Sequence, residues 1–193
     1  MGKNYETELP AGYREVFTVD AEKDKTFIIW MNVAAIVIAA VIILAGWLII
    51  RPQGLIENYS LLRNLLLLAA LFAYIVLHEL VHGAAYKMLT GRKLTFGFTM
   101  TVAFCGVPDI YVYRKTALIS LMAPFTVFTV VFLAMAFLLP DAWDRFYAVI
   151  LLGVHAGGCA GDLYDTFLYL TKFRDPSTLM NDTGPKQTFY QAE

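Results

Sequence analysis

A long uncharged segment is the feature that most constrains how this chain can fold. Residues 27–50 read FIIWMNVAAIVIAAVIILAGWLII and contain no Asp, Glu, Lys or Arg. A segment of this length crosses a bilayer as a helix, because a helix satisfies its own backbone polar groups in lipid. The whole chain is 59% hydrophobic and only 16% charged, whereas soluble domains carry about a quarter charged residues. We therefore predict an all-α, multi-pass membrane protein.

Three further apolar segments extend the prediction to four membrane-spanning helices. The predicted spans are 27–50, about 65–88, 117–139 and 146–171, within a membrane domain over 27–172. A mixed-charge leader, 1–26, precedes this domain without a cleavage site for a signal peptide. The polar tail, 173–193, contains Pro and Gly and is expected to be a mobile extension.

The distribution of basic residues predicts the orientation of the spans. Twelve Lys and Arg residues lie before the first span, between the second and third spans, and after the fourth, while the other two connectors hold three. Basic residues favour the cytosolic side, so we predict a cytoplasmic-membrane protein with both termini in the cytosol. The net charge of −1 argues against a nucleic-acid-binding protein.

Two histidines and a glutamate interrupt the second apolar segment within five positions, in the sequence HELVH. On a helix, His78 and His82 are one turn apart on the same face, where both imidazoles can bind one zinc ion. Glu79 lies between them and can act on a metal-bound water without being a ligand. Ionisable residues are rare within membrane spans and usually functional. The pattern therefore predicts a zinc peptidase site, with Glu79 as the catalytic base.

The third zinc ligand is predicted from depth in the membrane. His78 and His82 lie nine and five residues before Lys87, at the cytosolic end of the second span. Asp162 lies ten residues before Lys172, at the cytosolic end of the fourth. At ~1.5 Å per residue, Asp162 is level with the histidine pair to within about one helical turn, and His155 is about 10 Å further from the cytosol. Asp162 is therefore the preferred ligand.

Two other polar residues of the fourth span are secondary candidates. His155 is a candidate second-sphere or substrate-contacting group, and direct ligation remains a lesser alternative. Asp165 is either an outer-shell partner of a ligating histidine or an interfacial residue near water. Small residues such as Gly157, Gly158 and Gly161 predict close packing of the fourth span on the second.

The connector between the second and third spans alternates apolar and small residues with period two. The sequence LTFGFTMTVAF places the apolar side chains Phe96, Phe98, Met100, Val102 and Phe104 on one face of a strand. A turn at GVPD then returns the chain, which predicts a small β-hairpin over 94–113. Its open edge is a candidate strand for pairing with an extended substrate. A hairpin that only seals the helix bundle is the alternative.

These motifs resemble those of a known family. HELVHG in a membrane helix, with an aspartate in a later span, resembles the site-2 protease class of intramembrane zinc proteases. The series HELVHG, FGF, LMAPF and GCAGD, between about Leu65 and Leu170, is more similar to the putative zincin peptidases, short bacterial membrane proteins. The resemblance implies a zinc peptidase with ligands His78, His82 and Asp162. The chain lacks the asparagine and glycine that flank the aspartate in site-2 proteases.

The predicted function is a membrane-embedded endopeptidase that uses one Zn²⁺ ion. Its partners would be the lipid bilayer and a membrane-protein or peptide substrate, cut within or near the membrane. The alternatives are a non-catalytic membrane protein that binds metal or haem, a transporter, and a pseudoprotease that binds clients without cutting them. A polar patch that only holds the spans together is the simplest alternative for the charged triplet.

Overall fold

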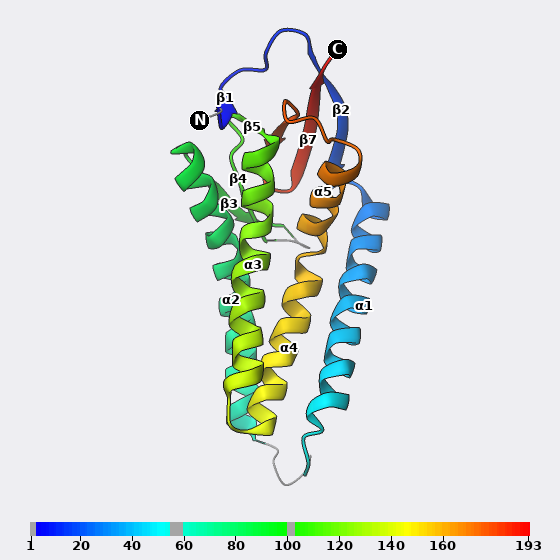
Figure 1. Ribbon diagram of the computed structural model, residues 1–193, viewed down its shortest axis with the longest axis vertical. Coiled ribbons are helices and arrows are strands. Elements are labelled where there is room, and N and C mark those ends of the chain that lie inside the picture. Colours follow the sequence, from blue (N-terminus) through cyan, green and yellow to red (C-terminus); the bar gives the residue numbers. More distant parts are fainter. Residues whose placement is uncertain (1–2, 55–59, 100–102) are drawn as a thin grey trace. The chain divides into compact units, whose positions relative to one another are not determined.

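The computed structural model describes residues 3–54, 60–99 and 103–193 (Figure 1). Within these ranges the helices are α1 (Lys25–Ile50), α2 (Leu61–Thr90), α3 (Arg114–Leu138), α4 (Ala142–Gly158) and α5 (Ala160–Thr171). The strands are β1 (Tyr5–Glu6), β2 (Tyr13–Asp20), β3 (Thr95–Phe98), β4 (Ala103–Gly106), β5 (Tyr111–Tyr113), β6 (Leu179–Asp182) and β7 (Lys186–Ala192).

The chain forms two compact units. Unit 1 contains Met1–Trp30, Val76–Pro124 and Asp162–Glu193, and unit 2 contains Met31–Ile75 and Phe125–Gly161. All described strands belong to unit 1, which also includes the C-terminal part of α2, the N-terminal part of α3 and most of α5. Unit 2 is built from helices within its described residues.

Three helices, α1, α2 and α3, are long and apolar enough to cross a membrane. A fourth candidate span is the pair α4 and α5, which a break at Cys159 separates. The first three correspond to the predicted spans with small differences at their ends. The fourth is not one continuous helix, because Gly157, Gly158 and Gly161 surround the break and glycine is a poor helix former. The chain has the character of a multi-pass membrane protein.

The fold is mostly helical, as predicted, but it is not all-α with only a small hairpin, because unit 1 also contains a five-stranded antiparallel sheet. Its strand order is β1-β5-β6-β7-β2 (Figure 1). The leader contributes β1 and β2, and the tail contributes β6 and β7. The longest pairing joins the two ends of the chain, from Tyr13 opposite Ala192 to Asp20 opposite Lys186. The tail expected to be mobile is therefore a central part of the sheet.

A buried cluster joins this sheet to the helices of unit 1. It includes Val19 of β2, Tyr86 of α2, Leu121 of α3, Tyr169 of α5 and Phe189 of β7. The strands of the leader and the tail have few apolar residues, and their burial depends on the helices that cover the sheet. The leader and the tail are too polar to be recognised separately as core segments, so no strands were predicted in them from the sequence.

The predicted hairpin over 94–113 is present but reverses direction earlier than expected. β3 pairs with β4, so the two arms of the hairpin are Thr95–Phe98 and Ala103–Gly106, and Tyr111–Tyr113 joins the five-stranded sheet instead. Cross-strand partners lie on the same face of a sheet. Phe96 and Phe98 are opposite Cys105 and Ala103, whereas Phe104 is opposite Gly97 on the other face.

The predicted apolar face therefore does not continue through the hairpin. Phe104 is separated from Phe96 and Phe98, and Met100 and Val102 lie outside the described residues. Alternation with period two continues through both arms of a hairpin, so the pattern does not reveal where the chain reverses.

Unit 2 is held together by close contacts between α1 and α4. A Cβ at Gly157 would overlap the carbonyl oxygen of Ala35, and one at Gly153 would lie 3.0 Å from the carbonyl oxygen of Ala39. The small-residue face of the fourth span thus packs on α1 rather than mainly on α2, although Gly158 does face Tyr74 of α2. Glycine permits this backbone-to-backbone approach, as it does in many membrane helix pairs.

Replacing Gly157 by Ala is expected to destabilise the α1–α4 contact. The added methyl group meets main-chain atoms, which cannot move independently, so we expect a cost of about 1–3 kcal/mol. Gly161→Ala is the matched control, because nothing lies within 4 Å of the Cβ it would add. Thermal unfolding in detergent should show a lower midpoint for Gly157→Ala only. Equal unfolding midpoints for the two variants would contradict the close contact of Gly157 with α1.

Candidate metal centre

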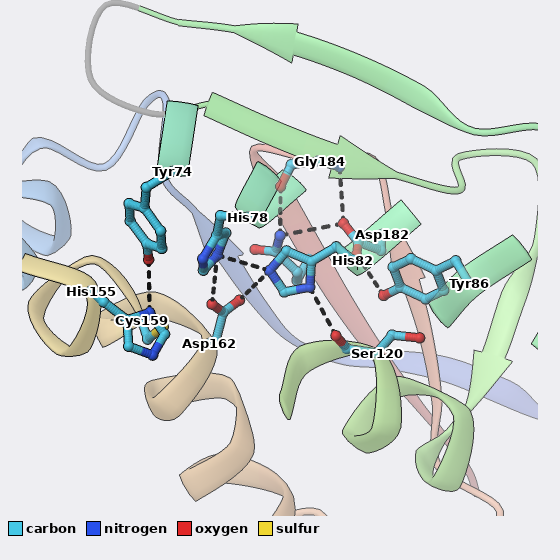
Figure 2. A network of polar contacts seen from close by, with 11 residues as sticks. Tyr74, His78, His82, Tyr86, Ser120, His155, Cys159, Asp162, Asp182 and Gly184 are labelled. Atoms are coloured by element: carbon cyan, nitrogen blue, oxygen red, sulfur yellow. Dashed lines mark hydrogen bonds and ion pairs between the residues drawn. The ribbon is translucent and has the colours of Figure 1, made fainter. Parts of the chain in front are cut away.

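Three predicted ligand residues meet in unit 1. His78 and His82 are one turn apart on α2, and Asp162 lies in the first turn of α5 (Figure 2). Both histidines are buried, with 7% of their surface exposed, and Asp162 is half-buried. The helix break at Cys159 starts α5 just before Asp162, so its carboxylate lies near the positive end of the helix dipole.

The donor atoms of these residues form a compact triangle. Nε2 of His78 lies 3.1 Å from Nε2 of His82 and 3.4 Å from Oδ2 of Asp162. Nε2 of His82 lies 3.3 Å from Oδ1 of Asp162. Zinc binds such ligands tetrahedrally at about 2.0–2.1 Å, which corresponds to donor–donor distances of about 3.3 Å. The triangle therefore fits one face of a zinc coordination tetrahedron.

A main-chain carbonyl fixes the orientation of the His82 ring. Nδ1 of His82 lies 2.8 Å from the carbonyl oxygen of Ser120 on α3. A carbonyl oxygen only accepts hydrogen bonds, so Nδ1 carries the hydrogen and the lone pair of Nε2 faces Asp162 and His78. A carboxylate and an imidazole lone pair repel each other at this distance unless a cation or a proton lies between them. The donor set thus suits a divalent cation.

Glu79 is the half-buried member of the HELVH motif. It is close enough to His82, His78 and Asp162 to interact with each electrostatically. A carboxylate beside a zinc site, but outside its ligand set, is the arrangement in which glutamate serves as a general base.

The β3–β4 hairpin lies against the helix that carries the motif. A Cβ at Gly83, the residue after His82, would come within 2.7 Å of the Phe96 ring and 3.1 Å of the Leu94 side chain. Cys105 of β4 interacts electrostatically with Glu79, and burial raises the pKa of its thiol to about 12. Cys105 is therefore neutral and unsuited to act as a nucleophile or a thiolate ligand.

His155 belongs to unit 2 and has its own set of partners there. It is fully buried, and its Nδ1 is hydrogen-bonded to the hydroxyl of Tyr74 at 2.9 Å (Figure 2). Its Nε2 lies 3.1 Å from Oγ1 of Thr129 and 3.3 Å from the carbonyl oxygen of Phe125. These contacts describe a histidine built into the packing of α2, α3 and α4.

Asp165 lies one turn after Asp162 on α5 and is buried, with 4% of its surface exposed. Its burial argues against the interfacial alternative. Oδ1 of Asp165 has no hydrogen-bond partner among the described residues.

Three participants near the site were not predicted from the sequence. They are the carbonyl of Ser120, the phenol of Tyr86 and the carboxylate of Asp182, which accepts a hydrogen bond from Tyr86. Tyr86 follows His82 by four residues and could have been noticed on the same helical face. Ser120 contributes only its backbone, and Asp182 lies in the tail, so neither had a local sequence signal.

Comparison with protein families adds one finding. Residues 71–177 match a family described as "Putative zincin peptidase", and this range contains the HELVH motif and Asp162 and covers more than half of the chain. Searches of the curated proteins and of the solved structures found no significant match.

Proposed function

The chain belongs to the putative zincin peptidase family, and on this premise we propose that it is a zinc-dependent endopeptidase of the membrane. The observation that carries the proposal is the triangle of donor atoms from His78, His82 and Asp162, with distances of 3.1–3.4 Å. The substrate would be a membrane-spanning or membrane-proximal segment of a protein, because the ligands lie on helices of the candidate spans.

The proposed mechanism assigns one task to each residue. His78, His82 and Asp162 would hold one zinc ion, which when bound polarises a scissile carbonyl and acidifies water. Glu79 accepts the proton from the attacking water and then delivers it to the nitrogen of the leaving amine. The carbonyl of Ser120 holds the His82 ring in the orientation needed for binding through Nε2.

The free edge of β3 is the proposed binding site for the substrate backbone. β3 pairs with β4 and has no second strand partner among the described residues. It lies beside the catalytic helix, through the contact of Phe96 with Gly83. A peptide bond within a helix is shielded from attack, and pairing with a strand edge would hold the substrate in an extended form.

The sheet supports a cytosolic orientation for the site. β1 and β2, which precede α1, share one sheet with β5, which precedes α3, and with β6 and β7, which follow α5. These three parts of the chain must therefore lie on the same side of the membrane. They also contain the twelve basic residues that favour the cytosol.

Phe98→Ala is expected to raise KM about 10-fold with little change in kcat. The Phe98 side chain is 72% exposed on β3, so it can contact a paired substrate without contributing to the zinc site. Phe137→Ala is the matched control, because Phe137 is 79% exposed but lies in unit 2 on α3. Cleavage kinetics of a reconstituted single-span substrate would measure the effect. An unchanged KM in Phe98→Ala would contradict substrate pairing at β3.

Metal analysis and a cleavage assay on the purified protein test the function as a whole. We expect one zinc ion per chain and cleavage of at least one member of a panel of single-span substrates in detergent or liposomes. Chelation should abolish cleavage, and added zinc should restore it. Zinc binding without cleavage of any panel member would favour a pseudoprotease, and absence of zinc would refute the proposal.

A further inference from the structure

The C-terminal hairpin, formed by β6 and β7, lies close to the helix that carries the HELVH motif. It is not part of the sequence range that matches the family. β6 and β7 lie after residue 177, where that match ends. Between them, Asp182, Thr183 and Gly184 begin a tight turn, in which Gly184 has a φ of 102° that favours glycine. This turn, residues 182–184, is in contact with both the catalytic helix and the β3–β4 hairpin.

The Asp182 side chain connects the turn to α2. Oδ2 of Asp182 accepts a hydrogen bond from the hydroxyl of Tyr86 at 2.7 Å (Figure 2). Its Oδ1 accepts from the main-chain N–H of Gly184 at 2.9 Å and from Nε2 of Gln187 at 3.3 Å. Asp182 and Tyr86 are 3% and 1% exposed, so water does not compete readily for these bonds.

The backbone of the same turn also contacts β4 of the hairpin and the residue that follows it. The N–H of Val107, directly after β4, donates to the carbonyl oxygen of Asp182 at 2.8 Å. Gly106 approaches the backbone of Thr183 and Gly184 so closely that no side chain fits there. The Phe104 ring packs on Gly184, where a Cβ would overlap it.

The turn thus completes a closed set of contacts that joins α2, the β3–β4 hairpin and the turn itself. α2 contacts β3 through Gly83 and Phe96, β4 contacts the turn, and the turn returns to α2 through Tyr86. Tyr86 lies on the same helical face as His78 and His82, two turns after His78 and one turn after His82. Asp182 also interacts electrostatically with Glu79, although no contact of Asp182 with a scissile bond is required.

We propose that Asp182 is a positioning residue of the peptidase, which holds the HELVH helix and the substrate-pairing hairpin in a fixed relation through Tyr86 and Val107. This inference rests on the proposed function and extends it to the C-terminal tail. A displacement of about 1 Å between a catalytic group and its substrate can reduce the rate ~10²-fold. Loosening this connection should therefore reduce turnover more than it reduces substrate binding.

Tyr86→Phe is the most selective test, because it removes one hydroxyl and keeps the buried ring. Thr188→Val is the matched control: Thr188 is 4% exposed on β7, and its hydroxyl is hydrogen-bonded to Thr18 of β2, away from α2. For Tyr86→Phe we expect kcat to fall about 10- to 100-fold, KM to change less than about threefold, and zinc content to remain at the wild-type value. Thr188→Val should retain wild-type kinetics.

Amide hydrogen exchange provides a readout that does not depend on catalysis. In the full-length zinc-loaded protein, Tyr86→Phe should accelerate exchange at residues 103–107 and at Gly184, and Thr188→Val should not. If the wild-type protein cuts no substrate, the proposed function fails. The hydrogen-exchange rates alone then decide whether the turn connects α2 to the β3–β4 hairpin. Equal exchange in both variants, or equal kcat in an active enzyme, would overturn the role of Asp182.

Discussion

Glu79→Gln is expected to abolish peptide cleavage while leaving one zinc ion bound per chain. Glutamine has nearly the same shape as glutamate but cannot accept a proton from water at neutral pH. A general base contributes about 10²–10⁴-fold to a hydrolysis rate, so kcat should fall by at least that factor. The triangle formed by His78, His82 and Asp162 does not include Glu79 and should remain intact.

Metal analysis and single-turnover cleavage of the same preparation would measure both effects. Glu79→Asp is an informative comparison, because it keeps the carboxylate at a shorter reach and should retain part of the activity. Wild-type cleavage by Glu79→Gln would refute the role of Glu79 as the base. Loss of zinc from this variant would instead indicate that Glu79 is itself a ligand.

His82→Ala is expected to lose zinc and activity together. His82 supplies one of the three donor atoms and is also the histidine whose Nδ1 is hydrogen-bonded to Ser120. Loss of an outer-shell partner already weakens zinc binding about 10- to 100-fold, and loss of a ligand should weaken it more. Zinc titration against a competing chelator, with thermal unfolding to verify the fold, would measure the change.

Two further variants determine the third ligand. Asp162→Asn replaces a charged donor by a neutral one and should weaken zinc binding strongly. His155→Asn should retain zinc, because His155 lies in unit 2 with Tyr74 and Thr129 as its partners. The reverse result, with zinc lost only in His155→Asn, would show that the ligand set derived from Asp162 is wrong.

Local patterns in the sequence were sufficient for the helices and for part of the site. Uncharged apolar segments predict spans because lipid allows few other structures. The spacing of His78 and His82 places them on one face of any helix. The depth of Asp162 in the membrane was predicted by counting residues to Lys172, at the cytosolic end of its span. In the structure the Asp162 carboxylate lies 3.3 Å from Nε2 of His82. The family resemblance drawn from these motifs is confirmed.

Long-range pairing was not predictable in the same way. The leader and the tail become β-strands because they pair with distant segments of the chain, as Tyr13 of the leader does with Ala192 and Met180 of the tail does with Val112. Their polar residues gave no local signal of burial. Similarly, the small residues around Gly157 indicated close helix packing but not the partner, which is α1.

The sequence by itself determined the membrane character, the candidate ligand residues and the placement of His78 and His82 on one helix, because these depend on composition and helical periodicity. Only the tertiary structure decided that the turn between β6 and β7 contacts α2, that Asp182 accepts a hydrogen bond from Tyr86, and that Ser120 orients His82. The physical reason is that such contacts join distant parts of the chain through single hydrogen bonds and backbone atoms. These leave no periodic pattern in one sequence.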